Sequence, residues 1–220
     1  MQAIEPCSLS GDLPVDNPTD LATEYEIVEI FHSVQGEGMH AGVPHVFIRF
    51  GKCNLRCEWC DTDFLTHETK TALDILGDVM AFPCKRIIFT GGEPMLNNLW
   101  PLHRLLKARG YSLSIETNGT IEVPEGMLDW ICVSPKDQIY PNAVIRQRTG
   151  DELKCVYLGQ DLAMYNELQQ GFKHLFLQPC YMDQESVEWN GRNFSHTETV
   201  VKMSPPWRLS LQTHKWMGVD

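Results

Sequence analysis

Three cysteines within eight residues are the part of this sequence best suited to chemistry. Cys53, Cys57 and Cys60 have a C-x3-C-x2-C spacing in the stretch CNLRCEWCDT. Disulfide geometry disfavours pairing across such short loops, and three thiols leave one over in any case. Three thiolates on one loop can instead hold three irons of a cube-shaped [4Fe-4S] cluster, which leaves the fourth iron open to a small molecule. The spacing therefore predicts an iron-sulfur cluster with one open iron.

Two other interpretations of this loop stay open from the spacing alone. Two of the cysteines could bind zinc with partners elsewhere, or all three could be buried core residues. Zinc sites usually show two separated pairs of ligands, such as a C-x2-C followed much later by a second pair. No second pair of that kind follows Cys60 in the sequence, which favours the cluster.

The bulk composition narrows the class of protein. A chain of 220 residues with 43% hydrophobic and 21% charged residues suits one ordinary globular domain. Its 18 Lys and Arg against 29 Asp and Glu give a net charge of −11, which argues against nucleic acid as a partner. Residues 1–23 carry no apolar run for export or membrane insertion. We therefore expect no membrane partner and a cytoplasmic location, where cysteines stay reduced.

The elements that must position the cysteine loop alternate along the chain. Apolar runs predict strands at 44–50, 86–90, 111–117, 129–135, 152–158 and 174–179. Helical spacing occurs over 71–82, 99–108 and 161–170. Continuous apolar strands that alternate with helices indicate a parallel sheet covered by helices. Because residues 25–220 are too few for the ~250 of a complete eight-unit barrel, we predict an α/β fold with a partial, open (β/α)6 barrel.

Two remaining segments are given no role in the site. Residues 1–24 are polar, contain prolines and lack periodicity, so we expect a mobile N-terminal extension before a single domain at 25–220. The stretch after Gln178, from 180 to 195, also shows no clear pattern. Cys132 and Cys155 lie in apolar runs and are expected to be core residues.

Small and polar residues follow the predicted strands. The carboxyl ends of parallel strands face one crevice, so these residues are expected to meet the cysteine loop at one site. Gly91 and Gly92 let main-chain groups approach an ammonium closely, and Lys136 supplies a point charge. Each of these motifs alone would more often be an ordinary turn. The full set is Thr90, Gly91, Gly92, Glu93, Glu116, Asn118, Ser134, Pro135, Lys136 and Gln178.

Together the cysteine loop and the GGEP segment resemble the radical S-adenosylmethionine (SAM) superfamily. Further motifs are similar to the 7-carboxy-7-deazaguanine synthase family, and QGEG, CDT and QTHK are the discriminating ones. The matching segments are VQGEG (34–38), FIRF (47–50), CDTDF (60–64), TGGEP (90–94), ETNG (116–119), WICVSPK (130–136), GDELK (150–154) and LSLQTHK (209–215). The resemblance covers the chain from about residue 26 to the C-terminus.

This resemblance implies a lyase of queuosine and 7-deazapurine biosynthesis, a tRNA modification pathway. Its cofactors would be the [4Fe-4S] cluster, S-adenosyl-L-methionine and Mg²⁺. The open iron would bind S-adenosylmethionine, and the resulting 5′-deoxyadenosyl radical would take a hydrogen atom from C6 of 6-carboxy-5,6,7,8-tetrahydropterin. Ring contraction and loss of ammonia would give 7-carboxy-7-deazaguanine. A reducing donor of the flavodoxin or ferredoxin type and a homodimer are also implied.

The resemblance also assigns roles to residues. Thr62 would hold Mg²⁺ through its hydroxyl together with the substrate carboxylate, although by position alone it would be a helix cap or a turn residue. No catalytic side chain is expected beyond the ligands of cofactor and metal. The substrate-binding residues would be Val34, Gln35, Gly36, Glu37, Arg49, Thr90, His214 and Asp220. The cofactor-binding residues would be Gly91, Gly92, Glu93, Glu116, Asn118, Ser134, Pro135, Lys136 and Gln178.

Two functions from other classes compete with this interpretation. One is a zinc-binding module without catalysis, which a colourless, zinc-containing protein after anaerobic purification would indicate. The other is a radical SAM enzyme that acts on a protein, such as a glycyl-radical activase. The short chain, the lack of a second cysteine cluster in the sequence and the QGEG and QTHK motifs argue against the activase.

Overall fold

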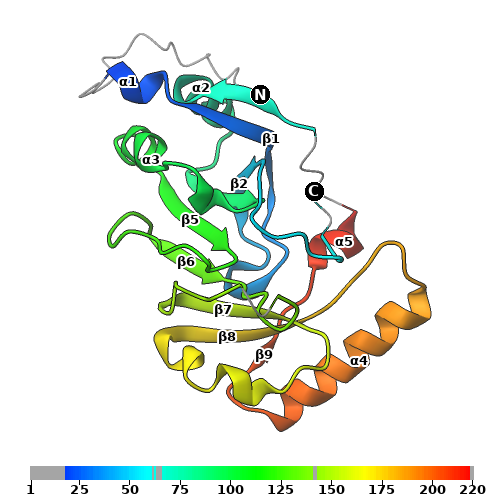
Figure 1. Ribbon diagram of the computed structural model, residues 1–220. Coiled ribbons are helices and arrows are strands. Elements are labelled where there is room, and N and C mark those ends of the chain that lie inside the picture. Colours follow the sequence, from blue (N-terminus) through cyan, green and yellow to red (C-terminus); the bar gives the residue numbers. More distant parts are fainter. Residues whose placement is uncertain (1–17, 61, 63–65, 141–142, 219–220) are drawn as a thin grey trace.

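A nine-stranded, mostly parallel sheet forms the framework of the molecule (Figure 1). The computed structural model describes residues 18–60, 62, 66–140 and 143–218. The strand order is β3-β1-β2-β4-β5-β6-β7-β8-β9, and every neighbouring pair from β2 to β9 is parallel. The strands are β1 (Glu24–Val34), β2 (Pro44–Phe50), β3 (Glu68–Thr71), β4 (Arg86–Gly91), β5 (Ser112–Thr117), β6 (Trp130–Val133), β7 (Gly150–Tyr157), β8 (Phe172–Pro179) and β9 (Arg208–Leu209). This open sheet confirms the predicted partial barrel, and each predicted strand is present.

Two strands of one edge were not anticipated. β1 runs antiparallel to β2, and β3 runs antiparallel to β1. β1 is the second strand from this edge, and β3 covers only its first residues, Glu24–Ile27, so polar residues such as Glu29 and His32 alternate with its apolar ones. This alternation hides the strand from a search for continuous apolar runs.

The α-helices of the described residues are α1 (Pro18–Leu21), α2 (Ala72–Met80), α3 (Trp100–Lys107), α4 (Val187–Met203) and α5 (Thr213–Met217), with 3-10 helices at Gly38–His40, Pro94–Leu96, Leu162–Tyr165 and Leu168–Gly171. Helices α2, α3 and α4 pack against the outer face of the sheet, whereas α5 lies at a cavity at the carboxyl ends of the strands. α2 begins at a capping box between Thr71 and Asp74. Its buried residues Ala72, Ile75, Leu76 and Val79 recur every three or four positions and pack into the core with β1 and β4. Among the described helices, none combines the length and the apolar character needed to cross a membrane.

The predicted helix over 161–170 is wrong. Two short 3-10 helices, Leu162–Tyr165 and Leu168–Gly171, occupy this region instead. Tyr165 ends the first and Leu168 begins the second, and both are buried in one core cluster. Tertiary packing thus selects the tighter turns over an α-helix.

The stretch from 180 to 195, to which the resemblance carried over no residue roles, contains the first half of α4. Ser186 caps the helix, because its hydroxyl accepts a hydrogen bond from the Trp189 amide at 3.1 Å. Thr197 is the one residue of α4 that is fully buried. A helix so exposed has no apolar stripe, and its sequence therefore lacks the usual periodic signal.

Ordered structure begins before residue 25. In α1 the Asp20 carboxylate accepts two hydrogen bonds from Arg104 of α3, at 2.6 and 2.7 Å. The Thr23 carbonyl then accepts a hydrogen bond from the Ala72 amide. Residues 18–24 are therefore attached to the domain, while the extension predicted for residues 1–17 lies outside the described residues.

The two faces of the parallel strands differ in polarity. In β7, Leu153 and Cys155 are buried in the outer core, whereas Glu152 and Lys154 face the inside of the partial barrel. β7 is thus alternating rather than continuously apolar, and it lines the barrel interior with ionisable groups. Cys132 and Cys155 are buried, as predicted.

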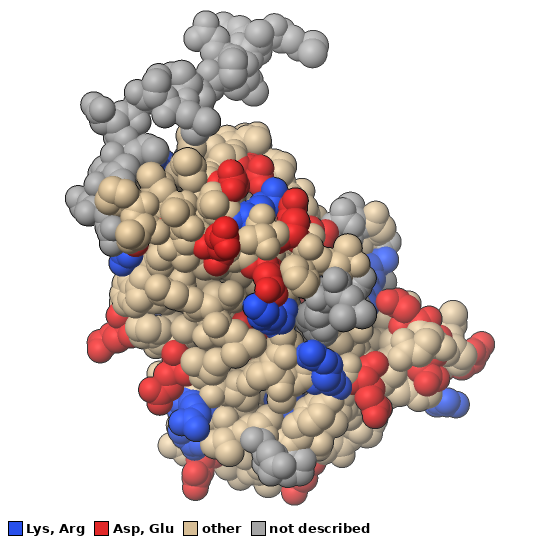
Figure 2. All heavy atoms as spheres, turned by 45° about the horizontal axis from the view of Figure 1, so that its top comes forward, with Lys and Arg blue, Asp and Glu red and all other residues tan. Residues whose placement is uncertain are grey.

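The outer surface carries no basic stripe on the face shown in Figure 2. There the described Lys and Arg side chains are scattered among Asp and Glu. Nucleic acid binding requires clustered positive charge along the backbone path. This face and the net charge of −11 both argue against such a partner.

Candidate active site

A cavity of about 260 Å³ lies at the carboxyl ends of the parallel strands, where the cysteine loop folds over the sheet. All the predicted site residues line it except Glu93, Pro135 and Asp220. Asp220 lies outside the described residues, and Pro135 is buried behind the cavity wall. The strand-end motifs and the cysteine loop therefore meet at one place, as parallel topology requires.

The three cysteines lie along one wall of this cavity. Cys53 and Cys57 are half-buried and Cys60 is exposed, and all the described cysteines are free. Within the described ranges, no three His, Cys, Asp or Glu side chains converge on a single-ion site. Burial raises the pKa of the Cys53 and Cys57 thiols, so thiolates there need positive charge beside them. Three thiols spread over one wall thus fit an iron-sulfur cluster better than one zinc ion.

Gly91 and Gly92 let the backbone after β4 pack directly against the backbone that leads into the cysteine loop. The Gly92 amide donates to the Phe50 carbonyl and the Glu93 amide donates to the Lys52 carbonyl, both at 2.9 Å. A Cβ on Gly92 would lie 1.8 Å from the Lys52 carbonyl oxygen, and Gly91 has a φ of 106°. Glycine is therefore required here for contact between two loops, in addition to any approach of a ligand.

The buried Glu93 side chain fixes this loop through hydrogen bonds. Its carboxylate accepts hydrogen bonds from the Asn118 amide at 2.7 Å, the Thr117 hydroxyl at 2.8 Å and the Met95 amide at 3.0 Å. Burial raises the pKa of Glu93, although these hydrogen bonds favour its ionised form. The side chain thus joins the ends of β4 and β5 and does not face the cavity, where the resemblance had assigned it a cofactor contact.

Lys136 and Ser134 lie beside the cysteine wall. The Lys136 ammonium donates to the carbonyl and the hydroxyl of Ser134, both at 2.7 Å. Burial lowers the pKa of Lys136, and the nearby Cys57 thiol opposes this change. The side-chain amide of Asn118 donates to Asn54 Oδ1 in the cysteine loop at 2.9 Å. A cation and oriented amides at this wall suit a ligand with a carboxylate.

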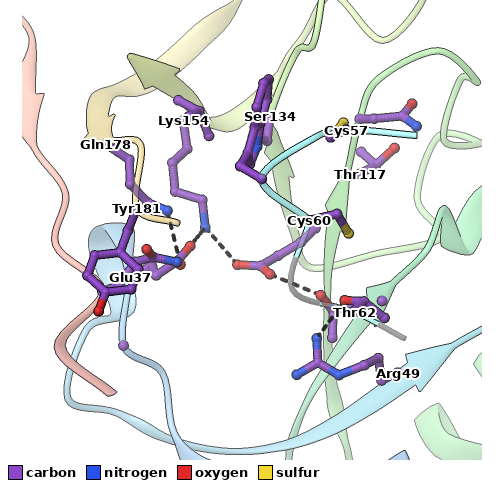
Figure 3. Close-up of a pocket in the computed structure, with 18 of the residues that line it drawn as sticks. Glu37, Arg49, Cys57, Cys60, Thr62, Thr117, Ser134, Lys154, Gln178 and Tyr181 are labelled. Atoms are coloured by element: carbon purple, nitrogen blue, oxygen red, sulfur yellow. Dashed lines mark hydrogen bonds and ion pairs between the residues drawn. The ribbon is translucent and has the colours of Figure 1, made fainter. Parts of the chain in front are cut away.

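The opposite wall contains a buried lysine between two carboxylates (Figure 3). Lys154 Nζ lies 2.5 Å from Glu37 Oε2 and 2.9 Å from Glu116 Oε1. Glu37 Oε1 also accepts hydrogen bonds from the amides of Gln178 at 3.0 Å and Gln212 at 2.9 Å. Glu116 and Gln178 had been assigned to the cofactor, and the structure places both in this carboxylate network.

Sequence reasoning missed Lys154 and Gln212. Lys154 belongs to the matching GDELK segment and Gln212 to QTHK, but neither was assigned a role. The alternation of β7 was the available signal, because it puts Lys154 on the same face as Glu152 in a strand otherwise packed into the core. Trp59, Cys180 and Tyr181 also line the cavity without having been predicted.

Arg49 points toward Thr62 in Figure 3. Arg49 Nη1 donates to the Thr62 hydroxyl at 3.4 Å, while its Nε pairs with Glu29 at 2.6 Å. The guanidinium lies 5.5 Å from the centre of the Phe31 ring. A hard hydroxyl oxygen beside a guanidinium is suited to a carboxylate that also binds a divalent cation.

The C-terminal segment closes the cavity over the Gln35–Glu37 turn. The amide and the hydroxyl of Thr213 both donate to the Gly36 carbonyl at 3.0 Å. His214 packs so closely on Gly36 that a Cβ there would lie 2.0 Å from His214 Nδ1. Gly36 is therefore the residue that lets His214 reach the cavity.

The open parallel sheet and the three-cysteine loop define a radical SAM protein, and the family model of the radical SAM superfamily matches residues 47–140. The 7-carboxy-7-deazaguanine synthase of Neisseria meningitidis serogroup B is 41% identical over 204 residues, which cover 90% of this chain and 95% of that protein. The 7-carboxy-7-deazaguanine synthase of Bacteroides thetaiotaomicron is 42% identical over 198 residues, 88% of this chain and 98% of that protein. The chain therefore belongs to the 7-carboxy-7-deazaguanine synthase family, which confirms the resemblance.

A solved structure agrees with this assignment. The crystal structure of QueE from Escherichia coli matches with a TM-score of 0.68 at 28% identity, and the match covers 86% of this chain and 93% of that chain.

Proposed function

We propose that this chain is a radical SAM lyase that converts 6-carboxy-5,6,7,8-tetrahydropterin to 7-carboxy-7-deazaguanine with loss of ammonia. The observation that carries the proposal is one cavity with two unlike walls. The cysteine wall suits a cluster and a ligand with an amino acid group, whereas the carboxylate wall suits a ligand rich in N–H donors. The similarity to curated synthases over 90% of the chain supports the same activity.

On the cysteine wall, Cys53, Cys57 and Cys60 would hold the cluster. Main-chain groups at Gly91 and Gly92 would bind S-adenosylmethionine, with further contacts from Asn118, Ser134 and Lys136. Bound together, cluster and S-adenosylmethionine supply a radical that removes a hydrogen atom from the substrate. The chain's own contribution is to orient the two ligands and to keep water from the space between them.

On the carboxylate wall, Glu37 and Glu116 would accept hydrogen bonds from the aminopyrimidinone ring of the pterin. Arg49 would bind the pterin carboxylate, and Thr62 would hold a Mg²⁺ ion on the same group. His214 lies beside Gly36 in reach of the ring site, and Asp220 remains a proposed substrate ligand from outside the described residues.

We further infer a small reducing protein of the flavodoxin or ferredoxin type as the electron donor. The exposure of Cys60 supports this inference, because an electron must enter the cluster from outside the chain. We also propose a homodimer, on the family resemblance alone, and a cytoplasmic location; sedimentation of the purified protein would test the homodimer.

An anaerobic assay tests the proposed function. Cluster-loaded protein with S-adenosylmethionine, Mg²⁺, dithionite and the carboxytetrahydropterin is expected to form a product with the mass of 7-carboxy-7-deazaguanine. Cleavage of S-adenosylmethionine without any deazapurine would contradict the proposed substrate. A colourless protein that holds zinc would contradict the enzyme class.

Thr62→Val is expected to reduce Mg²⁺-dependent turnover by about tenfold while iron content stays unchanged. Valine is close in shape to threonine but lacks the oxygen that a hard dication requires. Titrating Mg²⁺ in a steady-state assay checks this result, and Thr62→Ser, which keeps the hydroxyl, is the matched control. The same Mg²⁺ dependence in Thr62→Val and wild type would exclude Thr62 as the ligand.

A further inference from the structure

Lys154 is a buried lysine to which neither the cofactor nor the substrate assignment gives a role. Its side chain is 6% exposed and contacts carboxylates on two different segments, Glu37 after β1 and Glu116 on β5. Lysine is almost never buried in proteins unless it is paired. This charge lies at the base of the proposed substrate wall, where it can act on the groups that bind the substrate.

We propose that Lys154 is the positioning residue that keeps Glu37 and Glu116 ionised, so that they act as hydrogen-bond acceptors for the N–H groups of the substrate ring. This inference rests on the proposed function, because it names what the carboxylate wall recognises. A neutral carboxylic acid would present a proton to the ring where the ring itself presents one.

The hydrogen-bond directions around Glu37 support this role. The Gly38 amide donates to the Ser210 hydroxyl at 3.0 Å, and that hydroxyl donates to Gln178 Oε1 at 2.8 Å. With its Oε1 on Ser210, Gln178 presents its NH₂ group to Glu37, at 3.0 Å. The backbone N–H can only donate, and in this arrangement every following group passes its hydrogen on toward Glu37, whose carboxylate accepts.

A second chain of the same kind ends on Glu116. The Glu37 amide donates to Gln35 Oε1 at 3.1 Å, so the NH₂ group of Gln35 faces Glu116, at 3.2 Å. Lys154 donates to both carboxylates and is the described cation that pairs with both. The Lys154 ammonium and the side-chain amides of Gln35 and Gln178 thus all donate hydrogen bonds to the carboxylates of Glu37 and Glu116.

Lys154 acts on the ionisation of Glu37 through its charge. Burial opposes ionisation of Glu37, but the charge and the hydrogen bond of Lys154, together with the hydrogen bond from Gln212 and the nearby His214, hold the pKa of Glu37 below its ordinary value. The other charged or titratable groups near Glu37 are Glu116 on β5, Cys132 on β6, Glu152 on β7 and His214 on α5. Without Lys154, burial and the neighbouring carboxylates would raise the pKa of Glu37 instead.

The test measures binding of 6-carboxypterin, a fluorescent and redox-stable analogue, to cluster-loaded protein with S-adenosylmethionine and Mg²⁺. In Lys154→Met, the dissociation constant is expected to rise about 30-fold at pH ~6.5, and the loss should shrink as the pH rises toward ~9. The sign follows because Glu37 is protonated below its raised pKa and accepts again above it. Taking the ratio to wild type at each pH removes the titration of the pterin itself.

Two further variants separate charge from structure. Lys154→Arg keeps a cation and is expected to show no pH-dependent ratio. Lys154→Gln can still donate but lacks the charge, so it is expected to behave like Lys154→Met, and it serves if the methionine variant does not fold. Lys202→Met, which removes an exposed lysine from α4, is the matched control and should bind as wild type does.

The outcomes are distinct. A pH-dependent loss in the two neutral variants but not in Lys154→Arg supports the inference. Equal affinities in wild type and the neutral variants, or a loss that does not vary with pH, would overturn it while leaving the proposed function intact. A wild type that does not bind the pterin at all would overturn the substrate assignment and this inference with it.

Discussion

Changing Cys53, Cys57 or Cys60 to alanine is expected to remove most of the iron from anaerobically prepared protein. Each thiolate would bind one iron of the cluster. A loop with only two remaining cysteines leaves half of the irons without a protein ligand. Iron and sulfide analysis should give about four of each per chain in wild type and well under half of that in each variant.

A cysteine outside the loop provides the control for this experiment. Cys84 is buried in the outer core, away from the cavity, so Cys84→Ala should keep its iron. Iron near the wild-type level in all three loop variants would rule out the cluster assignment. Loss of zinc rather than iron would favour the zinc-binding alternative.

Gly92→Ala is expected to lower the free energy of unfolding by about 2–4 kcal/mol and to abolish tight binding of S-adenosylmethionine. The new Cβ would lie 1.8 Å from the Lys52 carbonyl oxygen, so the β4 loop and the cysteine loop must move apart. Urea unfolding and equilibrium dialysis with S-adenosylmethionine measure these two consequences.

The matched substitution is Gly77→Ala. Gly77 lies within α2, and a Cβ there meets no atom within 4 Å. Since alanine is a better helix former than glycine by about 1 kcal/mol, this variant should be as stable as wild type or more so. If the two alanine variants behave alike, close contact between the loops is not what position 92 requires.

Much of the framework followed from the sequence alone. The apolar runs located the parallel strands, since strands covered by helices keep an apolar outer face wherever they lie. Parallel topology then brought the ends of those strands to one crevice, so the gathering of Gly92, Asn118, Ser134 and Gln178 around the cysteine loop could be predicted. The thiol spacing also needed no fold, because three ligands within eight residues are close in any conformation.

Other features depended on packing between distant segments. Strands β1 and β3 and the exposed helix α4 lack continuous apolar patterns, because only one of their faces, or part of one, is covered. The direction of the Glu93 side chain was equally hidden, since its partners lie on β5 and the loop after it. A local motif does not show which of its groups bind a ligand and which bind the protein.

The carboxylate wall is the clearest case of a site decided by tertiary structure. Glu37, Glu116, Lys154 and Gln212 are separated by up to 175 positions, and each is an ordinary polar residue in its own segment. The sequence by itself determined that a cysteine loop would meet a ring of strand ends. Only the fold placed one buried ammonium between two carboxylates, because a charge is stable in the barrel interior only where partners from other strands arrive to neutralise it.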